Sequence, residues 1–163
     1  MAKNGRSEAL AKRIEQGAAE LAAFAEKLSE EEWRQPCNDR DRRPLGVLVH
    51  HVATMYPIEI DVAKTIAAGT AIVDVTWEAV AGINSKHSAD HATATRAEAL
   101  ELLRKNSKAA ADAVRAFTDE ELDTAAPFSL SFGAPMTAQF VIEDHALRHP
   151  WHHLSRMRKT VGR

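Results

Sequence analysis

Histidines are concentrated near the C-terminal end of the chain. Four of the eight histidines lie in the stretch HALRHPWHH, residues 145–153. His145 and His149 are four residues apart, and so are His149 and His153. On an α-helix, residues at this spacing project within ~40° of each other and lie ~6 Å apart along the axis. Either pair could therefore bind one metal ion through neutral imidazoles, with a third ligand supplied by another helix.

Two other segments of the chain carry paired histidines. His50 and His51 lie in VLVHHVATMY, and adjacent helical residues point ~100° apart, so at most one of them can share an ion with the C-terminal run. His87 and His91 also have helical spacing, but the surrounding sequence KHSADHAT is polar. We expect His87 and His91 to be surface residues that at most contact the metal ligands and do not bind the ion themselves.

Helical patterns dominate the elements that must position these histidines. Strand patterns with alternating apolar residues are scarce, and a final helix is expected to begin near Thr137. The fold class that we predict is all-α, an up-and-down-type four-helix bundle. Apolar residues recur at helical spacing in three earlier segments: residues 7–27, 44–68 and 94–117.

Prolines and glycines indicate where these helices are interrupted. Pro57 is expected to kink or end the second helix before it continues to about Ala68. Residues 72–92 are expected to form a connection with a short helix around residues 77–83. The segment PFSLSFGAPM is expected to be a loop.

A weak internal repeat organises the chain into two halves. LSEEEWRQP follows the first helix, and the similar FTDEELDTAAP follows the third. Ser29 and Glu32 form a capping-box pattern in the first copy. Each copy leads through a loop to a histidine-bearing helix, so two helix-loop-helix halves would combine into one bundle. The repeat predicts a metal site between the second and fourth helices.

Composition excludes several classes of function. The chain has 163 residues, 21 basic and 23 acidic, which favours one domain over residues 1–163 and argues against nucleic-acid or anionic-membrane partners. Arg40, Arg42 and Arg43 alternate with aspartates and are expected to form a solvated loop. The single cysteine, Cys37, excludes an internal disulfide, and the N-terminus has no signal-peptide pattern. We expect a cytoplasmic protein in which Cys37 has no chemical role.

The segments HALRHPWHH and PLGVLVHHVATMY, together with LSEEEW and RAEALELLRK, resemble the DinB-like superfamily over about residues 8–160. This superfamily includes the DinB proteins, the bacillithiol- and mycothiol-dependent S-transferases and the maleylpyruvate isomerase N-terminal domain. The resemblance implies a divalent ion, nickel or zinc, held by one histidine of the second helix and two of the fourth. The ligands it implies here are His51, His145 and His149, with the pair His149 and His153 as the alternative register. Pro150 favours the upstream pair if the helix kinks there, and displaces His149 if a new helical turn begins there.

Three imidazoles leave coordination positions open for water or substrate, as in catalytic metal sites. The resemblance therefore implies a metal-dependent thiol S-transferase, isomerase or hydrolase that acts on a small molecule, with a low-molecular-weight thiol as a cosubstrate in the first case. The alternative is a non-enzymatic metal- or small-molecule-binding stress-response bundle with a degenerate site. The resemblance also suggests a homodimer formed through helical faces. Supporting or proton-transfer roles are open to four residues, each of which could instead be an ordinary solvated helix residue: Tyr56, Glu59, Asp61 and Asp144.

Overall fold

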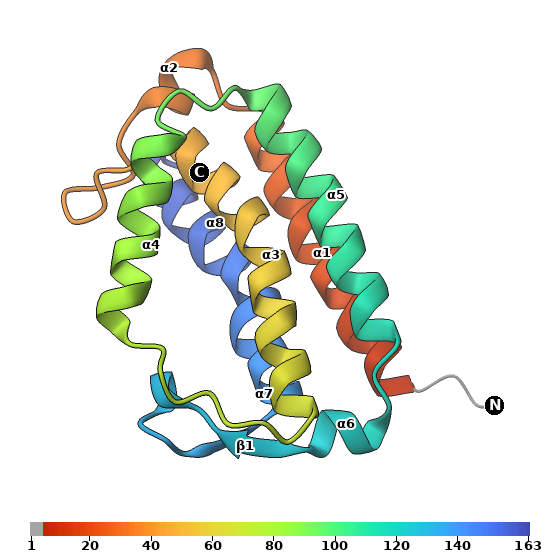
Figure 1. Cartoon of the computed structure of the whole chain (residues 1–163). Coiled ribbons are helices and arrows are strands. Elements are labelled where there is room, and N and C mark those ends of the chain that lie inside the picture. The colour runs from red at the N-terminus through yellow and green to blue at the C-terminus, as the bar shows by residue number, and fades with distance from the viewer. Residues whose placement is uncertain (1–4) are drawn as a thin grey trace.

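The computed structural model describes residues 5–163, which form a helical bundle closed at one end by a small β-ribbon (Figure 1). The first three bundle helices are α1 (Gly5–Glu26), α3 (Leu45–Ala67) and α5 (Arg96–Arg115). The fourth is composite and consists of α7 (Ala138–Ile142), the π-helical turn η2 (Glu143–Leu147) and α8 (Arg148–Thr160). The remaining elements are α2 (Glu30–Arg34), α4 (Trp77–Asp90), α6 (Asp119–Asp123), β1 (Ala125–Pro127), η1 (Ser129–Ser131) and β2 (Pro135–Thr137).

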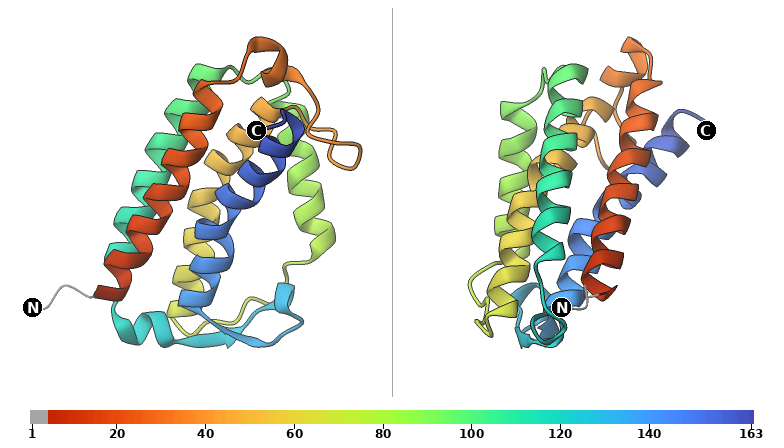
Figure 2. Two further views of the ribbon diagram at one scale, coloured as in Figure 1. Left: turned by 180° about the vertical axis from the view of Figure 1, so that it is seen from behind. Right: turned by 90° about the vertical axis from the view of Figure 1, so that its right-hand side faces the viewer.

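The four-helix bundle expected from the sequence is confirmed, and α4 gives it a distinctive order. α5 packs between α1 and α3, and the composite fourth helix packs against α1 and α3 on the opposite side (Figure 2). α4 lies outside the bundle and carries the chain back along its length, so α3 and α5 run in the same direction (Figure 1). In this arrangement α3 is covered by α5, by the composite helix and by α4. The histidines of α3 therefore face different neighbours on different sides.

The core forms because each long helix presents apolar residues at helical spacing. On α1, Leu10, Ile14 and Leu21 are at most 3 % exposed, and they share one face. Burial of each such side chain contributes roughly 1.5–3 kcal/mol. No helix within residues 5–163 is long and apolar enough to span a membrane. The other large side chains that are fully buried include Leu45, Leu48, Tyr56, Ile66, Leu103, Leu122, Ile142, Leu154 and Met157.

The internal repeat corresponds to two similar helical caps. Ser29 and Glu32 form the expected capping box at the start of α2, and Thr118 and Glu121 form the same box at α6. Trp33 of α2 packs against the start of α3 at Gly46, where an added Cβ would lie 2.2 Å from the indole ring. The close approach of these two residues fixes the end of α3 that carries the paired histidines.

Pro57 does not interrupt α3, contrary to the sequence expectation. The helix is continuous from Leu45 to Ala67 with Pro57 inside it. A proline in a helix leaves the carbonyl four residues earlier without its usual N–H partner. In this protein the side-chain amide of Asn106 on α5 donates to the Ala53 carbonyl over 2.9 Å. A neighbouring helix therefore replaces the missing hydrogen bond, and α3 passes the proline intact.

Two further segments are more regular than the sequence predicts. The helix expected around residues 77–83 extends over Trp77–Asp90, with Thr76 as its N-cap. Among the residues of α4 only His87 is buried. A helix that buries so little needs no apolar face, which is why the apolar periodicity of its sequence is weak. The expected loop PFSLSFGAPM contains parts of an antiparallel pair, β1 and β2, in which Ala126 faces Met136. These strands have three residues each, too few for an alternating pattern to be visible.

Candidate metal centre

Three histidines from two helices converge in the interior of the bundle. His51 comes from α3, and His149 and His153 come from one face of α8. One ring nitrogen from each lies within 4.8 Å of the others. His149 and His153 are one turn apart on regular α-helix, so their side chains project in nearly the same direction. We call these three residues the inner cluster.

The rings of the inner cluster direct nitrogen atoms at one another. The Nε2 atoms of His149 and His153 are 3.1 Å apart, and the His51 ring lies edge-on to both, with centroid distances of 4.9 and 5.5 Å. His51 and His153 are 3 % and 4 % exposed. Two imidazole nitrogens this close must share either a proton or a cation, because two facing lone pairs repel each other.

Glu59 orients His149 from the side opposite the cluster. Its Oε1 lies 2.7 Å from His149 Nδ1, and only 11 % of the Glu59 side chain is exposed. An ionised carboxylate can only accept, so Nδ1 carries the hydrogen and Nε2 keeps its lone pair for the cluster. Carboxylate–histidine pairs of this kind commonly fix the tautomer of a metal ligand and make it a stronger donor.

The surroundings keep the inner cluster uncharged. Burial, with smaller contributions from His149 and Arg43, lowers the pKa of His51 to about 2. Burial, followed by the neighbouring His149 and His51, also holds the pKa of His153 well below its usual range. Both rings are therefore neutral at pH 7, and neutral imidazole is the form that binds metal ions.

The donor set fits a divalent transition-metal ion. His51 Nδ1 and His153 Nδ1 are buried and have no hydrogen-bond partner among residues 5–163. The nitrogen that His153 directs at the cluster is Nε2, which lies 3.1 Å from His149 Nε2. Neutral imidazoles whose nitrogens approach one another in this way suit a shared cation. Three imidazoles suit zinc or nickel better than calcium or magnesium, which prefer oxygen.

Arg43 is a neighbour of the site that the sequence does not reveal. Its guanidinium is held by Asp41 at 2.8 Å, and its positive charge lowers the pKa of His51, His153 and His87 in addition to the larger effect of burial. Its side chain is 20 % exposed, so it is not the solvated loop residue expected from the alternating charges.

His145 lies outside the inner cluster, although the sequence favours it as a ligand beside His51 and His149. It belongs to the π-helical turn η2, which has more residues per turn than α-helix and so rotates His145 off the face of α8. Its ring packs edge-on to Phe128, with centroids 5.9 Å apart. The structure therefore brings together the alternative register, His149 with His153. Which histidines bind a metal stays a prediction.

Pro150 does not act as the sequence suggests. It occupies the first turn of α8, where a proline is tolerated, and a regular helical segment begins there without displacing His149. The Pro150 ring packs against α1 at Gly17, where an added Cβ would lie 3.0 Å from Pro150 Cγ. Pro150 thus contributes to the packing of α1 against α8 and leaves His149 and His153 on one face.

His87 and His91 are also placed differently from the expectation. His87 is 7 % exposed, not a surface residue, and it lies with His91 next to His50. His50, His87 and His91 form a second group of ring nitrogens within 4.8 Å of one another. His152 belongs to neither group and is exposed.

The other candidate residues separate by burial. Tyr56 is fully buried in the core, and burial followed by the charge of Glu59 raises its pKa. Asp61 of α3 is exposed, and Asp144, which belongs to η2, forms an ion pair with Arg148. Glu59 alone of these contacts a histidine of the inner cluster. Cys37 is 2 % exposed, and its sulfur lies 3.8 Å from the Thr160 hydroxyl.

Comparisons with known proteins agree with this architecture. The family model of the DinB superfamily matches residues 13–157. The structure resembles that of YfiT from Bacillus subtilis, described as "a probable metal-dependent hydrolase with an unusual four-helix bundle topology", with a TM-score of 0.76 and 17 % identity over 96 % of this chain and 86 % of that one. No curated protein sequence matches significantly. With the family model spanning most of its length, the chain belongs to the DinB superfamily.

Proposed function

We propose that the protein is a metal-dependent enzyme whose divalent ion, nickel or zinc, is held by His51, His149 and His153. The observation that carries the proposal is the convergence of the three ring nitrogens within 4.8 Å, with Glu59 fixing one of them. Three protein ligands leave positions open, which is typical of catalytic rather than structural sites. When bound, the ion would act as a Lewis acid and lower the pKa of a water molecule or a thiol.

The residues around the cluster have separate tasks in this proposal. Glu59 holds the His149 tautomer, and burial keeps His51 and His153 neutral and ready to bind. Arg43 supplies a fixed positive charge that would stabilise an anionic group of a small-molecule substrate or of the nucleophile. The His149 side chain is 18 % exposed, so a small substrate would approach the cluster beside His149 in this proposal.

We propose hydrolysis as the first reaction to test. The fold shared with YfiT, described as a probable metal-dependent hydrolase, supports this choice. Transfer of a low-molecular-weight thiol to a small electrophile is the second, because a thiolate would be stabilised by the same ion and by Arg43. A non-enzymatic metal-binding protein is the outcome if neither reaction occurs.

The test begins with metal content and then measures turnover. Protein purified without an affinity tag is loaded with nickel or zinc and analysed for bound metal, as wild type and as His149→Ala. The exposed His152→Ala variant, on the same helix, is the matched control. We expect His149→Ala to lose the ion of the inner cluster and all turnover, while His152→Ala keeps both.

The substrates then discriminate between the reactions. Small esters and amides test hydrolysis, and an alkylating electrophile with a low-molecular-weight thiol tests transfer. Metal binding without turnover on either panel would favour the binding protein. Metal binding that is unaffected by His149→Ala would rule out the proposed site.

A further inference from the structure

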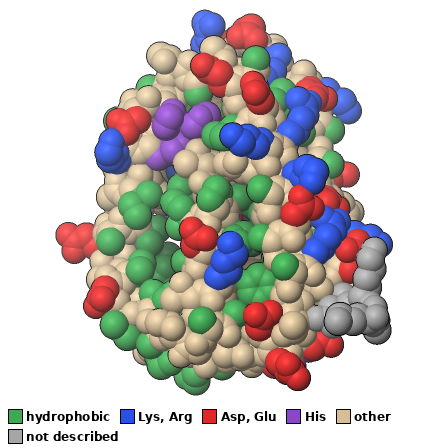
Figure 3. Space-filling view, turned by 45° about the vertical axis from the view of Figure 1, so that its right-hand side comes forward, with side chains coloured by type: hydrophobic (Ala, Val, Ile, Leu, Met, Phe, Trp, Pro, Cys, Tyr) green, Lys and Arg blue, Asp and Glu red, His purple; other side chains and the backbone are tan. Residues whose placement is uncertain are grey.

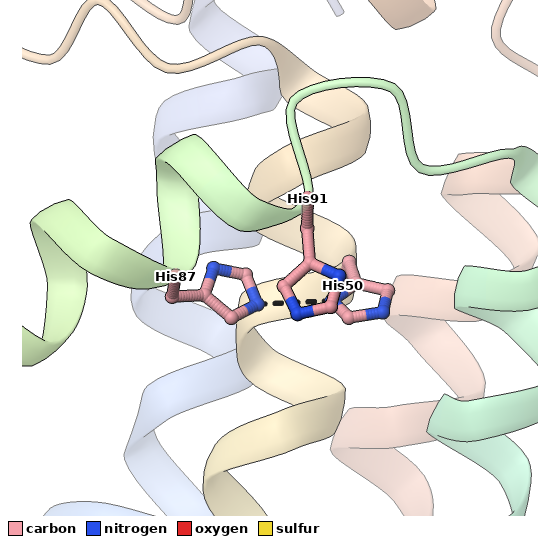
Figure 4. A group of neighbouring side chains, drawn as sticks. All are labelled: His50, His87 and His91. Atoms are coloured by element: carbon pink, nitrogen blue, oxygen red, sulfur yellow. Dashed lines mark hydrogen bonds between the residues drawn. The ribbon is translucent and has the colours of Figure 1, made fainter.

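His50, His87 and His91 form a second histidine cluster at the edge of the bundle, which we call the outer cluster (Figure 4). His50 comes from α3, His87 from the last turns of α4, and His91 is the C-cap of α4. One ring nitrogen from each lies within 4.8 Å of the others. We propose that the outer cluster is a second divalent-metal site, distinct in all its ligands from the inner cluster.

His50 and His87 already direct ring nitrogens at each other, as two ligands of one ion would. His50 Nδ1 lies 2.9 Å from His87 Nε2, and the dashed line of Figure 4 joins these atoms. The Thr54 hydroxyl lies 3.3 Å from the same His50 nitrogen and 3.5 Å from that of His87. It also donates to the His50 carbonyl, which fixes its position. Two nitrogens and an oxygen therefore surround one point between α3 and α4.

His87 is the anchor of this cluster. It is 7 % exposed, and its Nε2 atom faces the Nδ1 atom of His50. Burial, followed by the charges of His50 and His91, lowers the pKa of His87 to about 4, so the ring is neutral at pH 7. A neutral, buried imidazole whose Nε2 faces a second imidazole nitrogen, with a third ring beside it, is poorly explained by packing alone.

His91 completes the set from a position that can adjust. Its ring stacks on His50 with centroids 4.1 Å apart, and it lies 4.7 Å from the His87 ring. It is half-buried at the end of a helix, so rotation about its side-chain bonds is less restricted than for His87. A small rotation would turn its in-plane lone pair from stacking toward the point shared by the other two.

The outer cluster is reached through a cleft with a volume of about 570 Å³. His50 and His91 line it, and histidine side chains are visible at this surface in the space-filling view (Figure 3). Three carboxylates and one lysine, Lys105, line its walls, so the net charge of the lining attracts a cation. The acidic residues that line the cleft are Asp90, Glu98 and Glu101.

Adjacent positions on α3 separate the two clusters. His50 and His51 point ~100° apart, so one faces α4 and the other faces α8. The His51 and His87 rings are nevertheless in edge-on contact, with centroids 5.4 Å apart. The outer ion would therefore lie close to the inner one without sharing a ligand, and each site can be removed by itself.

Zinc stoichiometry tests the proposal. Tag-free protein is dialysed to equilibrium against zinc and analysed for bound metal, as wild type, His91→Ala, His149→Ala and the double variant. His91→Ala is chosen because His91 is half-buried and its loss leaves the core intact; His152→Ala is the control. We expect two ions in the wild type and the control, one in each single variant and none in the double variant. Circular dichroism establishes that every variant is folded.

The possible results separate the two sites. One ion in the wild type that persists in His91→Ala and disappears in His149→Ala overturns the outer site and leaves the inner one standing. One ion that disappears in His91→Ala and persists in His149→Ala does the reverse. No ion in the wild type overturns both. Cobalt absorption spectra add a second readout, since His91→Ala should remove one of two sets of bands if the outer site exists.

Discussion

The inner and outer clusters each consist of three histidines, but their surroundings differ. The inner cluster lies between two long helices, and a buried carboxylate fixes one of its rings. The outer cluster lies between α3 and a helix outside the bundle, contacts a threonine hydroxyl and opens to an acidic cleft. A rigid, carboxylate-supported set favours tight binding and defined geometry. An adjustable set at a cleft favours exchange with solvent.

The most direct way to break this comparison is to substitute the two neighbouring histidines of α3 in turn. We expect His51→Ala to abolish turnover and the inner ion, because it removes a ligand. His50→Ala should leave turnover and the inner ion in place and remove only outer metal binding. Activity assays with metal analysis measure both effects. Equal loss of turnover in the two variants would mean that the clusters act as one centre.

Glu59→Gln tests whether the carboxylate distinguishes the clusters. The amide still accepts from His149 Nδ1 but carries no charge, so we expect metal affinity at the inner cluster to fall by about 10–100-fold. Affinity at the outer cluster should not change. Titration with a competing chelator measures this, with the exposed Asp61→Asn on the same helix as the control. An unchanged inner affinity would reduce Glu59 to a packing role.

Acid sensitivity of the metal-free protein separates the clusters further. The pKa of His51 is lowered to about 2 and that of His87 to about 4, mainly by burial, from an ordinary value of 6.5. As pH falls below 6.5, the unfolded chain takes up protons that the folded chain does not, so stability decreases. The His87 contribution should be lost by about pH 4, whereas that of His51 continues to be lost below it.

Denaturant unfolding at several pH values, in the presence of a chelator, measures this difference. His87→Gln should flatten the stability curve only between pH 6.5 and 4, and His51→Gln should flatten it over the whole acid range. Identical curves for the two variants would show that the clusters are equally buried in solution.

The smallest expected effect concerns the hydroxyl of the outer cluster. Thr54→Val keeps the shape of the side chain and removes the oxygen near His50 Nδ1 and His87 Nε2. We expect outer zinc affinity to fall by roughly 2- to 10-fold, equivalent to about 0.5–1.5 kcal/mol for one lost polar contact. Inner affinity should be unchanged in the same titration. Stronger outer binding in the variant would exclude the hydroxyl from the site.

The sequence predicts the bundle well because its signals are local. Apolar spacing, the Ser29–Glu32 capping box and the repeated cap at residues 118–121 each depend on a few neighbouring residues. His51 and His149 were likewise predictable as partners, since the repeat places their helices together. Pro57 shows the limit, because the group that replaces its hydrogen bond is 53 positions away from Ala53 in the chain.

The choice between His145 and His153 depends on something that sequence does not carry. Both are four residues from His149, and only the π-helical turn at residues 143–147 decides which shares its face. The outer cluster was hidden for a related reason. α4 has almost no apolar face, so its helical pattern and the burial of His87 appear only when α3 is in place beside it.

Because α3 remains a continuous helix past Pro57, the positions of its residues on the two sides of the proline are coupled. His51 and Glu59 lie on either side of the proline and both contact His149 of α8. A bend in α3 between them would therefore move one contact relative to the other. The amide of Asn106 that replaces the missing hydrogen bond of α3 lies on α5, which contributes no histidine to either cluster. The alignment of the candidate metal centre thus depends in part on a helix that supplies none of its histidines.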